Sequence, residues 1–398
     1  MNNEILVIGA TGNIGRHVVA GLRERGASVR TLSRYPGATA TGDLTRPETL
    51  HSALSGVDSV FLLWPFLSAD GAQEVVDAIA EHARRIVYVS ALSVRDDASP
   101  EKNGVWGQVE AAIRRTSLEW TFLRPGGFAT NTLEWASAIR TGQPVRMPYP
   151  EAARSLIHEH DIADVAVLAL TEDGHAGKAY PLTGPAALTQ AEQVRVLGTV
   201  AGQGEAVVEE LPADQARAGM LTWATEEFAD SALAYWRSLV DTPEPVMSTV
   251  EELTGQPART FTQWAQDHDA DFRLLTSAEV AERYVAAFRT GRMDQATRLS
   301  AADVVRVAPL ETDGKHVELG GRDEIMANAE RLTRDLEFHA VTVDGPFQHG
   351  DQFAARFSFD VTHKPTGQRS TTSKMSLYTV TAGVITREEV FYFDPPAA

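Results

Sequence analysis

The chain contains no cysteine, which excludes disulfide bonds, thiolate zinc sites and a cysteine nucleophile. Positive charge is also scarce, because 36 Lys and Arg stand against 54 Asp and Glu, for a formal net charge of -18. No basic cluster offers the face that neutralises nucleic-acid phosphates, which argues against a nucleic-acid partner. No apolar run approaches a membrane span and no charged leader precedes one. We therefore expect a cytoplasmic protein without a membrane partner.

The most informative motif that is present lies at the start of the chain. The apolar run Ile5-Leu-Val-Ile8 leads into Gly9-Ala-Thr-Gly-Asn-Ile-Gly15 and then into apolar residues at helical spacing. In a dinucleotide-binding loop, Gly9 would permit the tight turn and Gly12 the approach of backbone N–H groups to a pyrophosphate, while Gly15 would let the helix pack closely on the strand. The strand and helix on either side supply the context that the motif requires. The sequence therefore predicts a dinucleotide cofactor.

The end of the next predicted strand, residues 28–33, indicates which dinucleotide is bound. Sites that prefer NAD place an acid there to hold the ribose 2′-OH, whereas NADP sites place an arginine there. Here the acid is missing and Arg34 is present. This pattern predicts NADP(H), with Arg16 and Arg30 as weaker candidates for the phosphate contact.

Three later predicted strands end in residues suited to a ligand. They run into Trp64, into Ser90, and into Gly126-Gly-Phe128. Strands that alternate with helices form a doubly wound parallel sheet, and the carboxyl ends of its strands share one edge. The sequence thus predicts an α/β fold of Rossmann type whose site lies at that edge. The residues expected beside the cofactor there are Leu63, Trp64, Ser90 and Phe128, with Asp43 and Leu44 in a loop near the adenine.

These residues carry a family resemblance over positions 4 to about 272. The matching segments are Gly9-Ala-Thr-Gly-Asn-Ile-Gly15, Gly42-Asp-Leu44, Val89-Ser-Ala91, Leu123-Arg-Pro-Gly-Gly-Phe128 with Asn131, His160-Asp-Ile-Ala-Asp-Val165 and Tyr180-Pro-Leu-Thr-Gly184. This region resembles the NmrA-like atypical short-chain dehydrogenases, close to actinobacterial NAD(P)H-binding proteins that resemble ergot-alkaloid reductases. The resemblance implies that Thr11, Gly12, Asn13 and Ile14 contact the pyrophosphate, Arg34 the 2′-phosphate, and Trp64, Ser90 and Phe128 the nicotinamide end.

The sequence departs from that family in its proton donor. Ketone-reducing members use a Tyr-x-x-x-Lys dyad, in which the phenol protonates the developing alkoxide. Alignment on Glu110 puts Lys102 and Trp106 at the two dyad positions, and no tyrosine lies between Tyr88 and Tyr149. The domain is therefore expected to reduce an activated C=N or C=C bond, in bacterial secondary metabolism. The alternative is a protein that only senses its cofactor.

Aromatic residues and two histidines complete the candidate site of this domain. His158 and His160 flank Glu159, but no third ligand has suitable spacing, so we expect no metal. A helix-rich lobe on the substrate side is expected over residues 185–265. The residues expected to line the substrate pocket are Trp64, Trp106, Phe128, Asn131 and Tyr149.

A second domain is expected after a boundary near residues 270–275. Thr276-Ser-Ala-Glu279 has the pattern of a capping box and opens a new helix. Helices followed by a meander of strands predict an α+β cone, a curved sheet wrapped on helices. The strands are expected at 337–343, 352–362, 370–381 and 384–393. The expected domains are residues 1–272 and 275–398.

The C-terminal region resembles the SnoaL-like branch of the nuclear transport factor 2-like superfamily. The segments that carry this resemblance are Tyr284-Val-Ala-Ala-Phe-Arg-Thr-Gly291, Asp360 to Arg369, Leu377-Tyr-Thr-Val380 and Ile385 to Asp394. The resemblance implies either a second pocket of the cyclase or isomerase kind or a module for binding or homodimerisation. Catalytic candidates are Glu389, Tyr392 and Asp394. Lys374 replaces an acid of catalytic relatives, which favours the second alternative.

Overall fold

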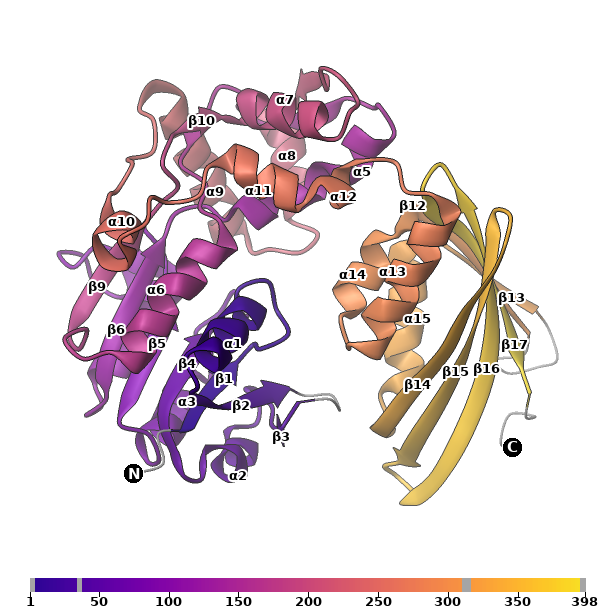
Figure 1. Ribbon diagram of the computed structural model, residues 1–398, viewed down its shortest axis with the longest axis horizontal. Coiled ribbons are helices and arrows are strands. Elements are labelled where there is room, and N and C mark those ends of the chain that lie inside the picture. Colours follow the sequence, from indigo (N-terminus) through magenta and orange to yellow (C-terminus); the bar gives the residue numbers. More distant parts are fainter. Residues whose placement is uncertain (1–3, 34–37, 310–315, 394–398) are drawn as a thin grey trace. The chain divides into compact units, whose positions relative to one another are not determined.

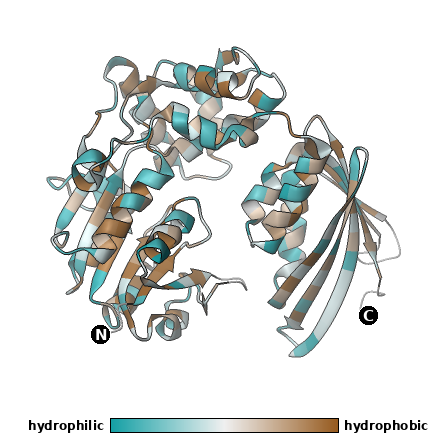
Figure 2. Ribbon diagram, viewed as in Figure 1, coloured by the Kyte–Doolittle hydropathy of each residue, from teal (hydrophilic) through white to brown (hydrophobic). Residues whose placement is uncertain are grey.

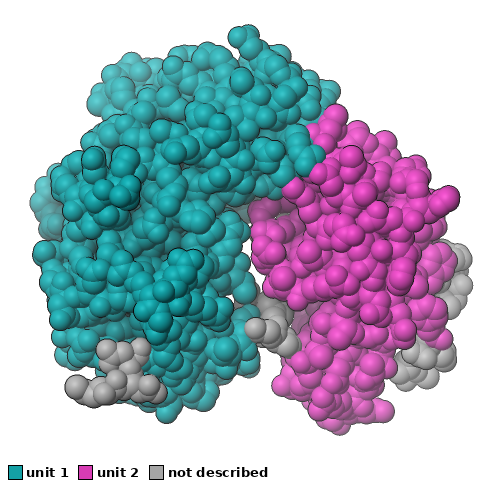
Figure 3. Space-filling model, in the orientation of Figure 1, with its two compact units in different colours: residues 1–34, 38–273 teal, residues 35–37, 274–398 magenta. Residues whose placement is uncertain are grey.

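A computed structural model describes residues 4–33, 38–309 and 316–393 (Figure 1). The described residues form two compact units, which divide between Arg273 and Leu274 (Figure 3). Each unit encloses hydrophobic cores of its own. No helix in the described ranges has the length and apolar character needed to cross a membrane.

The first unit is built on a parallel sheet of seven strands in the order β3-β2-β1-β4-β5-β6-β9. The order reverses between β1 and β4, and in such sheets the ligand binds outside the carboxyl ends of the strands at that point. The sheet confirms the predicted Rossmann-type fold. Its strands are β1 (Glu4–Ile8), β2 (Ser28–Ser33), β3 (Ala40–Thr41), β4 (Val57–Leu63), β5 (Arg85–Val89), β6 (Glu119–Pro125) and β9 (Lys178–Leu182).

Two layers of helices cover the sheet because successive side chains of each strand point to opposite faces. Leu6 and Ile8 face the core beneath α2, α3 and α4, whereas Ile5 and Val7 face the core beneath α1 and α6. The central strands are hydrophobic along much of their length, as Figure 2 shows. These helices are α1 (Gly15–Glu24), α2 (Leu50–Leu54) after η1 (Pro47–Thr49), α3 (Ala72–Ala80), α4 (Gly104–Arg114) after η2 (Glu101–Asn103), and α6 (Glu159–Thr171).

A smaller lobe follows the carboxyl ends of the strands. Its core contains the fully buried Trp264 and Phe272, and two short sheets pair β7 with β11 and β8 with β10. Residues from 129 to 139 also contribute to this core, so the lobe includes more of the chain than residues 185–265. The elements are η3 (Ala129–Trp135), α5 (Ala136–Arg140), β7 (Val145–Met147), β8 (Ala153–Arg154), β10 (Leu188–Thr189), α7 (Gln190–Val200), β11 (Val208–Glu210), α8 (Ala213–Met220), α9 (Glu226–Asp241), α10 (Thr249–Thr254), α11 (Phe261–Asp267) and α12 (Asp269–Phe272).

The second unit is a six-stranded sheet in the order β13-β12-β17-β16-β15-β14, packed on helices. Its first helix begins with the predicted capping box, because Thr276 accepts from the Glu279 N–H and Glu279 accepts from the Thr276 N–H. The unit confirms the α+β class. Its elements are α13 (Ser277–Arg289), α14 (Met293–Arg298), β12 (Ser300–Pro309), β13 (His316–Gly320), α15 (Arg322–Thr333), β14 (Leu336–His349), β15 (Gln352–His363), β16 (Gln368–Thr381) and β17 (Val384–Tyr392).

Two of these strands, β12 and β13, do not appear in the sequence prediction. In β12, Arg306 points inward and forms an ion pair with Glu388 of β17, with Nε 3.3 Å from a carboxylate oxygen. An inward arginine breaks the alternation of apolar and polar residues by which a half-buried strand is recognised. The hydrophobic pattern of β12 therefore did not identify it as a strand, because one of its inward-facing residues is the arginine of an ion pair.

Candidate active site

The glycine loop between β1 and α1 has the geometry of a phosphate cradle. Gly9 has a φ of +81°, which favours glycine, and a Cβ built on Gly15 would lie 2.1 Å from the Gly9 carbonyl oxygen. Gly12 is exposed, and within the described ranges the N–H groups of Asn13, Ile14 and Gly15 have no hydrogen-bond acceptor. Donors at the start of a helix suit an anion, so these residues fit the pyrophosphate of a dinucleotide.

The adenosine side of the site is described in part. Arg34, the predicted 2′-phosphate contact, lies outside the described residues, and β2 ends just before it, at Ser33. Asp43 is half-buried and accepts from the Thr45 N–H at 2.9 Å, while Leu44 packs in the core. Leu63 lies beside the glycine loop, with its Cβ 3.8 Å from the Cβ position of Gly9.

A buried ionic network holds the ends of β5 and β6. Glu110 of α4 is 2% exposed and accepts two hydrogen bonds from Arg124, Nε at 2.9 Å and Nη2 at 2.7 Å. Ser90 donates its hydroxyl to the same carboxylate at 2.6 Å. These hydrogen bonds raise the pKa of Arg124 against the effect of burial, and the charge of Asp96 adds to them. The Ser90 side chain is therefore turned toward α4. Its hydrogen bond fixes the end of β5 relative to that helix.

The predicted substrate residues lie in different places. Trp64 and Trp106 pack in the core beneath α2, α3 and α4, where the Trp64 indole donates to the Ser68 carbonyl at 2.8 Å. Phe128 packs in the core on the opposite face of the sheet. Tyr149 packs in the lobe, and Asn131 is exposed. These residues do not share one hydrophobic cluster, although Trp64 and Phe128 both follow the carboxyl ends of strands.

No tyrosine–lysine pair is formed at this edge by the residues that the structure describes. Lys102 is exposed, and Trp106 is packed in the core. The Tyr88 hydroxyl is fully buried and has no hydrogen-bond partner there, and burial raises its pKa far above the usual value. Tyr88 is therefore unsuited to donate a proton.

Polar residues that the sequence did not single out lie at the end of β6. Glu244 is 3% exposed and accepts from the Ser155 N–H at 2.8 Å and from the Ser155 hydroxyl at 2.9 Å. Tyr235 of α9 donates its hydroxyl to the same carboxylate. A Cβ on Gly126 would lie 3.3 Å from a Glu244 oxygen, and one on Gly127 would lie 2.1 Å from Arg154 Nη2. The paired glycines are the one signal in the sequence that points to this group.

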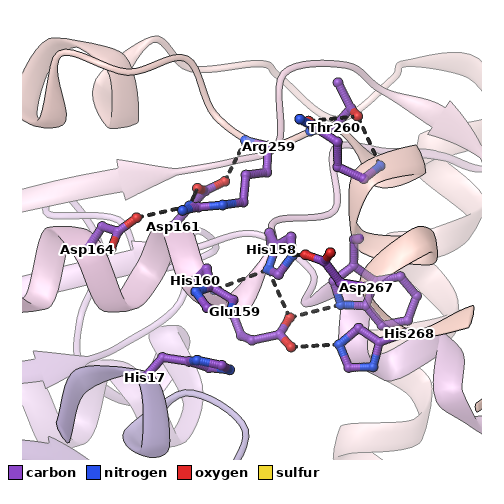
Figure 4. Close-up of polar contacts among 12 residues, drawn as sticks. His17, His158, Glu159, His160, Asp161, Asp164, Arg259, Thr260, Asp267 and His268 are labelled. Atoms are coloured by element: carbon purple, nitrogen blue, oxygen red, sulfur yellow. Dashed lines mark hydrogen bonds and ion pairs between the residues drawn. The ribbon is translucent and has the colours of Figure 1, made fainter. Parts of the chain in front are cut away.

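A second polar cluster joins the cofactor helix to the lobe (Figure 4). Glu159, 2% exposed, accepts from the Trp264 indole and from His268 Nε2, both at 2.8 Å. Although burial raises it, the hydrogen bond from His268 and the charge of that imidazole hold the pKa of Glu159 well below its usual range. On α1, the His17 ring contacts the His160 ring, with 3.6 Å between the centroids and 40° between the ring planes. The cluster thus couples α1, α6 and α11.

The two histidines considered as metal ligands have other partners in this cluster. His158 Nε2 lies 3.2 Å from an Asp267 oxygen, and His158 Nδ1 accepts from the His160 N–H at 3.1 Å. Elsewhere among the described residues, His51, Glu81 and His82 bring three ligand-type atoms together on the surface. All three are exposed, and exposed groups of this kind are common without a metal.

In the second unit the buried carboxylate is Glu388, next to the predicted candidate Glu389. Glu388 accepts from Ser376 at 2.9 Å and from Tyr378 at 3.2 Å. Although burial raises it, the charges of Arg306 and Lys374 keep its pKa below the usual value. Glu389 is half-buried and pairs with Arg387 at 2.8 Å, Tyr392 is 44% exposed, and Asp394 lies outside the described residues. The aromatic face of β17 points outward, which leaves Glu388 on the inner face.

Comparison with known proteins agrees with this geometry. Residues 9–173 match a family described as NAD(P)H-binding, and residues 281–388 match the SnoaL-like domain. An NAD(P)H azoreductase from Xenophilus azovorans is 36% identical over 67% of this chain and 99% of its own length. A (4-alkanoyl-5-oxo-2,5-dihydrofuran-3-yl)methyl phosphate reductase from Streptomyces griseus is 36% identical with the same coverage.

Solved structures share the fold of the first unit. Citrobacter sp. triphenylmethane reductase in complex with NADP(H) superimposes with a TM-score of 0.55 at 20% identity, over 67% of this chain and 99% of that one. An NADPH-dependent quinone oxidoreductase from Escherichia coli gives a TM-score of 0.56 at 22% identity, over 66% and 99%. The chain belongs to the NAD(P)H-binding, NmrA-like reductases, and it is an NAD(P)H-dependent oxidoreductase that also carries a SnoaL-like domain.

Proposed function

We propose that this protein transfers hydride from NADPH to an electron-poor conjugated acceptor, such as an azo compound, a quinone, or an activated C=N or C=C bond. The cofactor supplies two electrons and one hydrogen, and water supplies the remaining proton. Acceptors of this kind spread the developing negative charge over several atoms, so they need little help from a general acid.

One observation supports this substrate class above plain ketones. In the described part of the chain, the carboxyl edge of the sheet offers no phenol beside a lysine, because Lys102 is exposed and Tyr88 is sealed in the core. The names of the relatives, an azoreductase and a reductase of an unsaturated lactone, agree with acceptors of this type.

The test compares four acceptors under identical conditions: an azo dye, a menadione-type quinone, a conjugated lactone and cyclohexanone. We expect NADPH oxidation, followed by its absorbance, with at least one conjugated acceptor and not with cyclohexanone. A Gly12→Val variant is the control for reaction outside the cofactor site. Efficient ketone reduction would contradict the substrate class, and tight NADPH binding without any turnover would favour a cofactor sensor.

We further propose that the SnoaL-like domain pairs two copies of the chain. Its inner space is filled by its own aromatic side chains, since Tyr284, Phe353, Phe357 and Tyr378 are all buried. On β17, Phe391 is 48% exposed, as large apolar side chains at interfaces between copies often are. These features favour association over a second catalytic site.

A further inference from the structure

Arg154, the last residue of β8, is a charged side chain without a counter-ion. It is half-buried, and in the described ranges its guanidinium forms no hydrogen bond or ion pair. Its Nε atom is fully buried and has no acceptor. A buried donor left unpaired costs about 1 to 3 kcal/mol, so it calls for an explanation in a native protein.

The guanidinium lies against the carboxyl end of β6. Its Nη2 occupies the space that a side chain at Gly127 would need, at 2.1 Å from the Cβ position. Its Cζ lies 6.0 Å from the centre of the Trp236 ring. The guanidinium thus lies near Gly127 and Trp236, at the edge of the sheet where hydride transfer is expected.

The nearby carboxylates have other hydrogen-bond partners or lie beyond ion-pair distance of Arg154. The oxygens of Glu244 are committed to Ser155 and to the hydroxyl of Tyr235. Burial raises the pKa of the Glu134 carboxyl, and the nearby charge of Arg154 opposes that rise without an ion pair between the two side chains. Neither carboxylate forms an ion pair with Arg154.

We propose that Arg154 binds an anionic group of the acceptor, a carboxylate, sulfonate or phosphate, and so makes the reductase selective for acidic substrates. A planar guanidinium with unused N–H groups matches the paired oxygens of such a group. The guanidinium also lies within cation–π distance of the Trp236 ring, which favours its charged form at this place. This role rests on the proposed function, because it concerns the acceptor of the same site.

The test uses two azo dyes that differ in one group, methyl red with its carboxylate and the methyl ester of the same dye. We expect the wild-type protein to prefer the acid in kcat/KM. In Arg154→Met the KM for the acid should rise about tenfold or more, with little change for the ester, and Arg154→Lys should restore part of the preference.

Arg146→Met is the matched control, since Arg146 lies in the same lobe but is exposed and pairs with Glu209 at 3.3 Å. Equal use of both dyes by the wild type would overturn the role of Arg154 and leave the proposed function standing. If neither dye is reduced, the anion site is tested by binding alone. Calorimetry then compares the affinities of the NADP+-loaded protein for benzoate and for benzamide. Equal binding of benzoate by the wild type and Arg154→Met would then refute the anion site.

Discussion

Single glycines in the first loop serve two different purposes. The Cβ position of Gly12 lies 3.2 Å from the Gly9 carbonyl and otherwise faces open space, whereas that of Gly15 lies 2.1 Å from the same oxygen. We expect Gly12→Val to abolish NADPH binding at near-normal stability, because its side chain occupies the phosphate position. Gly15→Ala should lower the melting temperature, because backbone must move. NADPH fluorescence titration and thermal melts measure the two effects, and normal binding by Gly12→Val would place the cofactor elsewhere.

The preference for NADPH is expected to depend on Arg34. The other two arginines considered for this contact have protein partners. Arg30 contacts Glu4 and the carbonyls of Ala53 and Ser55, and Arg16 contacts His17. A charge-assisted arginine–phosphate contact stabilises by roughly 1.5 to 3 kcal/mol. Arg34→Ala should therefore weaken NADPH binding about tenfold or more and leave NADH binding nearly unchanged. Calorimetry measures both affinities, and Arg25→Ala is the control variant. Equal affinity of the wild-type protein for NADPH and NADH would contradict the assignment of Arg34.

Among single residues, the sequence predicted the turn of the glycine loop more closely than the directions of the side chains expected beside the cofactor. The motif from Gly9 to Gly15 was recognisable because phosphate binding depends on glycine at fixed spacing. Trp64 and Ser90 were also predicted at strand ends, but hydrogen bonds to Ser68 and Glu110 engage their side chains. Arg154 and Glu244 were missed because they come from distant segments that only the folded chain brings to Gly126 and Gly127.

At the scale of the elements, the histidine cluster between α1, α6 and α11 makes stability depend on pH. Burial opposes the charge of His268, yet hydrogen bonds to Asp271 and Glu159 raise its pKa to about 9. The resulting stabilisation of the native state is complete below about pH 6.5, the pKa of a histidine in the unfolded chain, and it is lost as pH rises toward 9. Burial, together with the charges of His160 and Arg16, lowers the pKa of His17 to about 4, so its contribution is lost as pH falls from about 6.5 toward 4.

We therefore expect the first unit to be most stable near pH 6.5. The alkaline loss should be on the order of 2 kcal/mol and should vanish in His268→Gln. Urea unfolding followed by tryptophan fluorescence measures this unit alone, because all seven tryptophans precede residue 274. His175→Gln, a change outside the cluster, serves as the control. An unchanged free energy of unfolding between pH 6.5 and 9 in the wild type would rule out a charged His268 in the native state.

Elements with a simple hydrophobic pattern were predicted closely, and those that bury charge were not. β5 and β6 end within a residue of their predicted limits, because buried parallel strands are rich in apolar residues. β2 spans the predicted residues 28–33, although only Leu32 in it is buried. β12 was missed because Arg306 faces inward. For β17 the predicted bounds, 384–393, agree with the observed Val384–Tyr392, whereas the catalytic candidate Tyr392 proves to be exposed.

At the scale of the whole molecule, the first unit corresponds to complete proteins. Two relatives match 67% of this chain over 99% of their own length, so a reductase of this kind exists without a SnoaL-like domain. Separate cores on either side of Arg273 agree with this division. Loss of the second unit should therefore spare cofactor binding, and its contribution should be found in assembly.

Deleting residues 274–398 tests that expectation directly. We expect the shortened chain to fold and to bind NADPH with unchanged affinity, while light scattering gives twice the mass of one chain for the full-length protein and a monomer for the shortened one. Phe391→Lys should also yield monomers, because it places a charge on the exposed aromatic face, and Thr381→Lys, at the hairpin end of β16, is the control. Full-length protein that is itself monomeric would remove the pairing role and direct attention to the buried group around Glu388 and Tyr378 as a second site.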